Sequence, residues 1–437
     1  MNRVKLGEIA EIYDGAHATP KKTSEGPIYL GLDAISDDCC LIPSEYVHLS
    51  EEDYQQWTKK VVPQVGDIVF SYEATIGRYA RIPEGMKCAL GRRLAVVRPC
   101  KDKVDTDWLF YYFRSPAWTK FIENHVYRGS TVNRVSIEDY PSYPVEVPNL
   151  SEQRKVSAIL GAIDDKIALN KRLCAELEET ARLVYDYWFT QFDFPDENGK
   201  PYKSSGGKMV WNEELKREIP EGWKTARASD LFDLERGYSY SSGDLSEQDE
   251  VPFISLACFG RKLDYRSQEL KHLKDGVRCS SWVKPNDMLI ACTDLTRGAD
   301  IIGCPIRVPD QFDKYAYSMD LAKVINLSRD VKRGYLYQSL RTNWFHKFAK
   351  GHTSGTNVIH LNLDVFKWFS LAIPPVELQE RYDGICHYLF TLSDIELRED
   401  VELVATRDFL LPMLMNGQIK VSIASDASGT VDAKATS

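Results

Sequence analysis

The chain has 437 residues, of which 43% are hydrophobic and 27% are charged, a composition typical of a globular protein with about two to four domains. The formal net charge of -9 argues on its own against a nucleic-acid partner, because phosphate contacts need clustered Lys and Arg. The charge is unevenly distributed, however: residues 75–134 carry 12 basic and 5 acidic side chains, a net +7. This block is a candidate positive footprint for a nucleic acid.

Ten cysteines and eight histidines are scattered along the chain, and the only adjacent cysteines are Cys39 and Cys40. In a chain of this length they are expected to be reduced thiols. No CxxC or HExxH motif occurs, so no metal site is expected. The N-terminus lacks an apolar signal core, and no apolar run approaches the ~18 residues of a membrane span. A cytoplasmic protein is therefore expected.

The sequence consists of two weakly similar halves with a period of about 220 to 227 residues. Each half has, in the same order, an amphipathic helical turn ending in glycine, β-rich segments, an aromatic helix with a polar loop after it, and a strand that leads through a proline into a long helix. The matching pairs are 6–15 with 228–237, 26–32 with 251–257, 66–72 with 286–292, 94–97 with 321–324, 108–122 with 335–349, and 145–155 with 371–381.

Two long helices are expected, at residues 151–192 and 376–414. The first follows a proline and has Ser151 as its expected N-cap. Its apolar positions recur in steps of four and three, the pattern of a helix–helix seam, and its one polar member, Asn170, is typical of a residue that fixes register. The seam consists of Val156, Leu160, Ile163, Ile167, Asn170, Cys174, Leu177, Ala181, Val184 and Trp188.

The second helix keeps the same steps but is interrupted. Its apolar positions are Tyr382, Ile385, Leu389, Leu392, Leu403 and Leu410, and its interruptions are Glu396, Glu399 and Thr406. Each helix alone could instead pack on a globular core. Their corresponding positions in a duplicated chain favour pairing as an antiparallel coiled coil.

The predicted fold class is α+β, with two β-rich modules in tandem pseudo-repeat separated by the two long helices. The connector between the halves is rich in Gly, Pro, Ser and Lys, as expected for a segment with little core. The C-terminal tail is small and polar, which predicts disorder. The expected domains are a first module at 1–150, a spacer helix at 151–192, the connector at 193–222, a second module at 223–375, a second spacer helix at 376–420 and the tail at 421–437.

The best enzymatic candidate is a nuclease signature formed by Pro195-Asp196 with Glu214 and Lys216. Nucleases of this type hold a divalent metal and activate water on adjacent strands of a rigid sheet. Here the residues lie among turn formers, and residues 213–218 are expected to form a charged helical turn, so solvation is the favoured role. The Pro-Pro-aromatic loop of adenine methyltransferases, a P-loop and GxSxG are absent from the sequence. No catalytic or metal-binding residue is therefore assigned.

A polar loop follows the aromatic helix in each half, with donors and acceptors that suit phosphates and base edges. Either loop alone could be an ordinary surface turn, but recurrence at equivalent positions favours DNA binding. The loop candidates are Arg128, Ser130, Thr131, Asn133 and Arg134, then Lys350, His352, Thr353, Ser354, Thr356 and Asn357. Further candidates, for which a solvated surface role is an equally good interpretation, are Lys21, Lys22, Tyr72, Arg78, Arg92 and Arg93 in the first half and Tyr238, Tyr240, Arg261, Lys262 and Arg297 in the second.

This layout resembles the specificity subunits of type I restriction-modification enzymes over essentially the whole chain. The most specific stretch is the central one, YDYWFTQFDFPDENGKPYKSSGGKMVWNEELKREIPEGW at 185–223, and VPNLSEQRKVSAIL and IPPVELQERYDGI resemble that family's helix entries. The resemblance implies that each half is a target recognition domain for one part of a split DNA sequence. It also implies partners: two methyltransferase subunits that use S-adenosylmethionine, and restriction subunits that use ATP and Mg. No cofactor is then expected in this chain.

Two unlike modules on rigid spacers would read two unlike half-sites of double-stranded DNA at a fixed distance, which gives a bipartite, asymmetric target. Two alternatives remain open. A stand-alone metal-dependent nuclease would cleave DNA as the purified chain, and a purely structural helical adaptor would not bind DNA at all.

Overall fold

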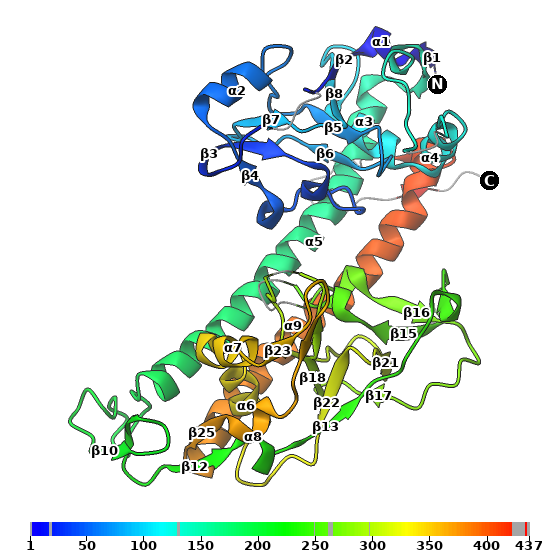
Figure 1. Ribbon diagram of the computed structural model, residues 1–437. Coiled ribbons are helices and arrows are strands. Elements are labelled where there is room, and N and C mark those ends of the chain that lie inside the picture. The colour runs from blue at the N-terminus through cyan, green and yellow to red at the C-terminus, as the bar shows by residue number, and fades with distance from the viewer. Residues whose placement is uncertain are drawn as a thin grey trace. The chain divides into compact units, whose positions relative to one another are not determined.

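The computed structural model describes most of the chain in two compact units (Figure 1). The described residues are 2–16, 20–128, 132–248, 250–260, 265–296, 298–421 and 433–434. Unit 1 comprises Met1–Ile167 and Leu403–Ser437, and unit 2 comprises Ala168–Glu402. Of the helices within the described ranges, none combines the length and the apolar character that a membrane span requires. The tail predicted at 421–437 lies mostly outside the described residues.

Unit 1 is built around a four-stranded antiparallel sheet in the order β2-β8-β5-β6. A three-stranded sheet of order β4-β3-β7, in which β3 and β7 are parallel, and the pair β1–β9 complete its strands. Every residue of β5 is buried, so both faces of the main sheet are covered. The strands are β1 (Asn2–Lys5), β2 (Ala10–Asp14), β3 (Thr23–Leu30), β4 (Val47–His48), β5 (Ile68–Ser71), β6 (Tyr79–Arg81), β7 (Cys88–Leu90), β8 (Leu94–Pro99) and β9 (Pro144–Val147).

Two aromatic helices, α3 (Thr106–Arg114) and α4 (Pro116–Glu123), supply much of the core of unit 1. The prediction of one continuous helix here is wrong. Ser115 is extended, and its hydroxyl accepts a hydrogen bond from the backbone N–H of Trp118 at 3.4 Å, which caps a new helix. The following proline has no N–H to continue α3. Shorter helices are α1 (Leu6–Ile9) and α2 (Glu51–Trp57).

The predicted helical turn at residues 6–15 is helical only in α1. From Ala10 onward the chain is strand β2, because its backbone groups pair with β8, from Ala10 opposite Pro99 to Asp14 opposite Ala95. Tertiary pairing thus overrides the local helical pattern of this segment.

Unit 2 repeats the strand order of unit 1, with a four-stranded antiparallel sheet β13-β22-β18-β20. A five-stranded sheet of order β14-β16-β15-β21-β17 again contains one parallel pair, β15–β21. The duplication predicted from the sequence is therefore confirmed. The strands of these sheets are β13 (Asp233–Arg236), β14 (Leu245–Ser246), β15 (Val251–Ile254), β16 (Lys271–Leu273), β17 (Trp282–Val283), β18 (Met288–Ala291), β20 (Pro305–Arg307), β21 (Tyr315–Tyr317) and β22 (Leu321–Ile325).

Smaller elements complete unit 2. Its aromatic segment is also two helices, because Thr342 caps α7 by accepting from the backbone N–H of Phe345 at 3.2 Å. A three-stranded sheet has the order β19-β24-β23, and β12 pairs with β25. These elements are α6 (Arg333–Ser339), α7 (Asn343–Lys350), α8 (Val365–Trp368), β12 (Lys224–Arg227), β19 (Thr293–Asp294), β23 (Thr353–Ser354), β24 (Ile359–Leu361) and β25 (Ser370–Ile373).

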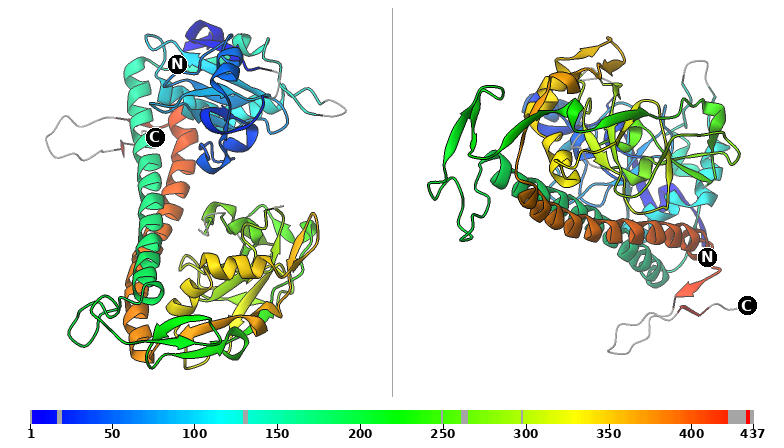
Figure 2. Two further views of the ribbon diagram at one scale, coloured as in Figure 1. Left: turned by 60° about the vertical axis from the view of Figure 1, so that its left-hand side comes forward. Right: turned by 90° about the horizontal axis from the view of Figure 1, so that it is seen from below.

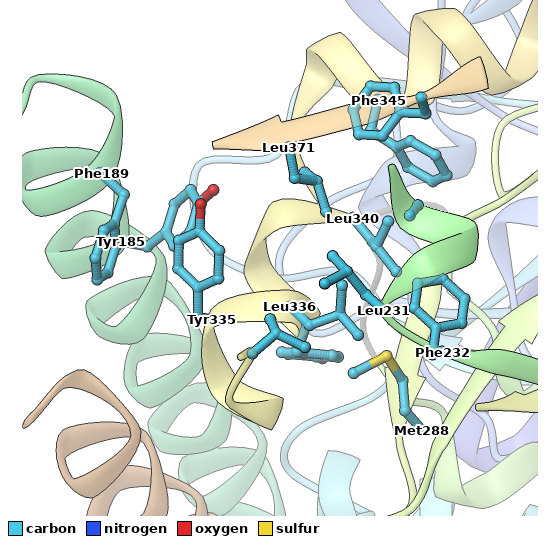
Figure 3. Packing of buried hydrophobic residues seen from close by; sticks show 14 of the residues in the cluster. Tyr185, Phe189, Leu231, Phe232, Met288, Tyr335, Leu336, Leu340, Phe345 and Leu371 are labelled. Atoms are coloured by element: carbon cyan, nitrogen blue, oxygen red, sulfur yellow. The ribbon is translucent and has the colours of Figure 1, made fainter. Parts of the chain in front are cut away.

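Figure 3 shows how the core of unit 2 joins α6 to the end of the first long helix and to the main sheet. The ring of Phe189 meets that of Tyr335 edge-on, with centroids 4.8 Å apart. Further along α6, Leu336 packs in the same buried cluster as Leu231 and Met288. Burial of these large side chains stabilises unit 2 by roughly 1.5–3 kcal/mol each.

The two long helices are α5 (Leu150–Tyr185), continued by a π-helical turn at Asp186–Thr190, and α9 (Val376–Met415). The N-cap of α5 is Asn149 and not Ser151, since the Asn149 side chain accepts from the backbone N–H of Glu152 at 3.0 Å. The predicted seam is confirmed, because all ten of its members are buried or half-buried.

Within unit 2 the helices run antiparallel, as contacts along them show (Figure 2). The Tyr382 hydroxyl donates to the carbonyl of Ala181 at 2.8 Å, and Cys174 Sγ lies 3.6 Å from Ser393 O. Asn170 is fully buried and its amide donates to Glu399 and to Asp400, both at 2.9 Å. The polar position of one helix thus meets the acidic interruption of the other.

The connector contains a hairpin of β10 (Met209–Asn212) and β11 (Arg217–Pro220). The expected helical turn at 213–218 is therefore wrong: residues 213–216 form the hairpin turn, with Lys216 at a φ of 50°, and residues 217 and 218 begin β11. Glu214 accepts hydrogen bonds from the hydroxyls of Ser370 and Thr225, so it braces β12 and β25. Asp196 accepts from the backbone of its own turn at 2.8 Å. Nothing in this geometry favours a nuclease.

Candidate nucleic-acid interface

In unit 1, three loops meet where strand β5 ends. The backbone N–H of Tyr72 donates to the carbonyl of Arg93 at 3.2 Å, and the carbonyl of Tyr72 accepts from Val135 at 2.8 Å. One step further, the N–H of Ala74 donates to the carbonyl of Asn133 at 3.1 Å. We call this meeting of loops the first junction; it consists of residues 72–78, 91–93, 127–128 and 132–135.

The same arrangement occurs in unit 2 where β18 ends. The N–H of Cys292 donates to the carbonyl of Asp320 at 2.8 Å, and the carbonyl of Cys292 accepts from Leu361 at 2.9 Å. Both polar loops predicted from the sequence therefore occupy the same place in their modules. We call this meeting the second junction; it consists of residues 292–296, 318–320 and 353–361.

Each polar loop is held as a hairpin by its own backbone. In unit 1 the main chains of Tyr127 and Arg134 exchange two hydrogen bonds, of 2.8 and 3.2 Å. In unit 2 β23 pairs with β24, and the turn between them needs Gly355, whose φ is +105° and whose added Cβ would lie 2.0 Å from Val358 O. In the second hairpin, the side chains at the tip thus project from a fixed backbone.

Several predicted DNA-binding residues of the first half are exposed, four of them at the first junction and two, Lys21 and Lys22, just before β3. They are Lys21, Lys22, Arg92, Arg128, Asn133 and Arg134. Among the described residues, none of the basic side chains in this set takes part in an ion pair, so their charges are available to an anionic partner.

Three other predictions in the first half fall on residues that already serve the fold. Arg78 forms an ion pair with Asp37 at 2.6 Å, and Arg93 forms one with Glu73 at 2.9 Å. Tyr72 is only 6% exposed and lies in the core. Burial, together with a hydrogen bond to a nearby carboxylate, raises the pKa of its hydroxyl above the ordinary value. Tyr72 therefore does not line a surface groove.

In the second half, Lys350, Ser354, Thr356 and Asn357 are exposed, whereas the other described candidates are half-buried. Thr353 Oγ1 donates to the carbonyl of Lys350 at 3.0 Å. His352 Nδ1 lies 2.8 Å from Phe348 O. Tyr240 packs edge-on against Phe253 at 4.7 Å, and Tyr238 packs against the same small core. The predicted residues Ser130, Thr131, Arg261, Lys262 and Arg297 lie outside the described residues.

Comparison with known proteins gives the family. Residues 1–179 and 220–403 match the family model described as the type I restriction modification DNA specificity domain. These two segments cover most of the chain. The chain belongs to this family.

Its relatives include two specificity subunits from Methanocaldococcus jannaschii. The type I restriction enzyme MjaIX specificity subunit is 23% identical over 397 residues, which cover 86% of this chain and 84% of that protein. The putative type I restriction enzyme MjaX specificity subunit is 26% identical over 435 residues, covering 95% and 93%. A crystal structure of a type I restriction-modification system S subunit from M. genitalium aligns over 94% of this chain and 95% of its own, with 15% identity and a TM-score of 0.49.

In this specificity-domain chain, one buried glutamine fixes the start of each long helix to its module. Gln153 accepts from the backbone N–H of Asp105 at 2.7 Å and donates to Pro148 O at 2.8 Å. Gln379 accepts from Lys332 N at 2.8 Å and donates to Pro374 O at the same distance. Neither glutamine was predicted from the sequence. The sequence repeat contains a signal for them, because the two glutamines occupy the same position in the two helix entries.

Carboxylates on the long helices also bind arginines, both from the modules and from the other long helix. In unit 1, Asp164 accepts from Tyr111 and from Arg114 and Arg407, at 2.8, 2.9 and 3.0 Å. Burial opposes the charge of this carboxylate, but the two arginines and the tyrosine outweigh it and lower the pKa of Asp164 below its ordinary value. Within the described residues, no group of three or more His, Cys, Asp or Glu side chains is placed to hold a metal ion.

Proposed function

We propose that this chain reads DNA for a type I restriction-modification complex, with each junction contacting one half of a bipartite, asymmetric target. Residues 1–150 and 223–375 are then the two target recognition domains. The observation that carries the proposal is the recurrence of one junction, built from the same backbone hydrogen bonds, in two modules with different side chains. Two junctions with the same backbone geometry but different side chains can read two half-sites of different sequence.

The exposed basic residues give the proposal its electrostatic basis. Arg92, Arg128 and Arg134 at the first junction and Lys350 at the second are exposed, and cations of this kind bind DNA mainly through phosphates. Specificity then comes from neighbouring polar and apolar side chains that reach base edges. The net charge of -9 does not prevent this, because binding depends on the local field of the contacting surface.

The proposed role is non-catalytic, and the cofactors belong to partners. The proposed partners are two methyltransferase subunits, which use S-adenosylmethionine, and restriction subunits, which use ATP and Mg; the complex acts in the cytoplasm. Relatives named as specificity subunits of type I restriction enzymes support this assignment. Glu214→Ala tests it against the nuclease alternative and should leave DNA cleavage by the complex intact. Loss of cleavage with normal assembly and DNA binding would assign the chemistry to this chain.

The decisive experiment is methylation-sensitive sequencing of DNA from cells that carry the chain with its methyltransferase subunit. We expect one split motif with a fixed gap. Exchanging residues 223–375 for the corresponding region of a relative should then change only one half of that motif. A change in both halves, or no motif at all, would contradict reading by separate modules.

A further inference from the structure

Three large apolar side chains are exposed at the second junction. Leu295 is 68% exposed, the highest value among the large apolar side chains of the described residues, and Met319 and Val358 are 48% and 38% exposed. They belong to three separate loops: the one after β19, the one before β22 and the hairpin loop between β23 and β24. Exposed apolar side chains gathered at a binding site are candidates for contacts with the ligand.

Strand pairing brings these three loops together. Asp294 pairs with Ile359, so Leu295 and Val358 directly adjoin the last paired step of this ladder. The N–H of Cys292 donates to the carbonyl of Asp320, and Met319 precedes Asp320 in the turn before β22. The three apolar side chains therefore belong to loops that adjoin the same end of these paired strands. We call this group the apolar patch.

The loops that carry the patch are rigidly held. Asp294 is fully buried and accepts hydrogen bonds from the backbone N–H groups of Thr296 at 2.7 Å and Ile301 at 2.8 Å. Met319 is fixed by its N–H, which donates to Tyr238 O at 2.8 Å. Because the backbone is already ordered, little conformational entropy is lost when these side chains meet a ligand.

The first junction has different chemistry at two of the three corresponding positions. The shared backbone hydrogen bonds match Leu295 to Thr75 and Met319 to the exposed Arg92. The third position, 358, corresponds to the half-buried Val132. The apolar patch is therefore a property of the second module and not of the shared scaffold.

We propose that the apolar patch reads the 5-methyl groups of thymines in the major groove of the second half-site. The thymine methyl is the one apolar group that a base edge presents in that groove. An exposed cation lies beside the patch, since Arg236 donates to Met319 O at 2.9 Å, and the exposed Lys350 ends helix α7 just before the adjoining hairpin. Neighbouring phosphates can therefore be bound at the same time. This inference rests on the proposed function, because it assigns a chemical specificity to one of its two junctions.

The test uses the complex with its methyltransferase subunits and a duplex that contains the methylated motif. Each thymine of the second half-site is replaced in turn by deoxyuridine, which lacks only the methyl group. For a contacted thymine we expect about fourfold weaker binding, the size expected from losing one buried methyl-sized group. Leu295→Ala should bind the thymine and uracil duplexes equally at that position, whereas Leu295→Met should keep the difference.

Two controls separate the possible failures. Val65→Ala, at the opposite end of β5 and 57% exposed in the wild type, should keep the full thymine preference. If the complex binds the motif and a scrambled duplex equally, the proposed function fails and the inference with it. If binding is specific but insensitive to every uracil, or if Leu295→Ala keeps the preference, only the inference fails. A second half-site without any A·T pair would also overturn it.

Discussion

Replacing Asp394 tests how the second module is attached to helix α9. The Asp394 carboxylate receives both terminal nitrogens of Arg307, at 2.7 and 2.9 Å. Both side chains are buried, with 10% of the arginine and 9% of the aspartate exposed. Arg307 lies on β20 of the main sheet, so this pair joins the sheet to the helix.

Asp394→Ala leaves a guanidinium buried without its counterion. Breaking a buried pair in this way lowers the free energy of unfolding by about 3–5 kcal/mol. At ~1.4 kcal/mol per factor of ten, this changes the unfolding equilibrium more than a hundredfold. Amide hydrogen exchange measured on peptides from β20 and α6 reports on unit 2 alone, and we expect its protection there to fall by at least that factor. Removing both charges, with Arg307→Met and Asp394→Leu together, should restore most of the protection, since no unpaired charge then remains.

A surface pair that also involves α9 is the control. Lys332 and Glu380 lie 2.8 Å apart, but Glu380 is 57% exposed, so Glu380→Ala should cost at most about 1 kcal/mol. If Asp394→Ala changed protection no more than Glu380→Ala, the buried pair would not be what attaches the sheet to α9.

Three further predictions concern both units. Arg134→Ala and Lys350→Ala should each lower the slope of log affinity for DNA against log salt by about one; unchanged slopes in both would place these loops away from the duplex. The pKa of Asp164 is lowered in the folded state, so its contribution to stability is full above the ordinary value of 3.8 and is lost as pH falls below it. In denaturation measured below pH 4, Asp164→Asn should therefore lose stability less steeply with falling pH than the wild type. An equally steep loss in the two proteins would contradict the assignment. One heptad added after Leu177 and one after Leu403 lengthens each helix by roughly 10 Å. This should widen the gap in the methylated motif by up to about three base pairs at ~3.4 Å each. An active enzyme that keeps its original gap would exclude the helices as the spacer.

Repeated patterns in the sequence were sufficient to predict the architecture. The steps of four and three from Val156 to Trp188 predicted the buried side of α5, because a helix places such residues on one face whatever it packs against. The duplicated order of segments predicted two modules, and the main four-stranded sheet has the same strand order in both. The errors occurred where a local signal had a competitor, as at Ala10–Asp14, where pairing with β8 replaced the helical pattern.

The candidate interface divides in the same way. Sequence alone placed polar loops after the aromatic helices, and the exposed Arg134 and Lys350 follow from that placement. It could not distinguish them from Arg78, whose charge is paired with Asp37, because 41 residues separate the partners along the chain and only the folded loop brings them together. The apolar patch was invisible for the same reason. Its three side chains come from separate loops, which meet only once β19, β22 and β24 are aligned. The sequence therefore determined which residue types are present, and the tertiary structure determined which of them lie near one another.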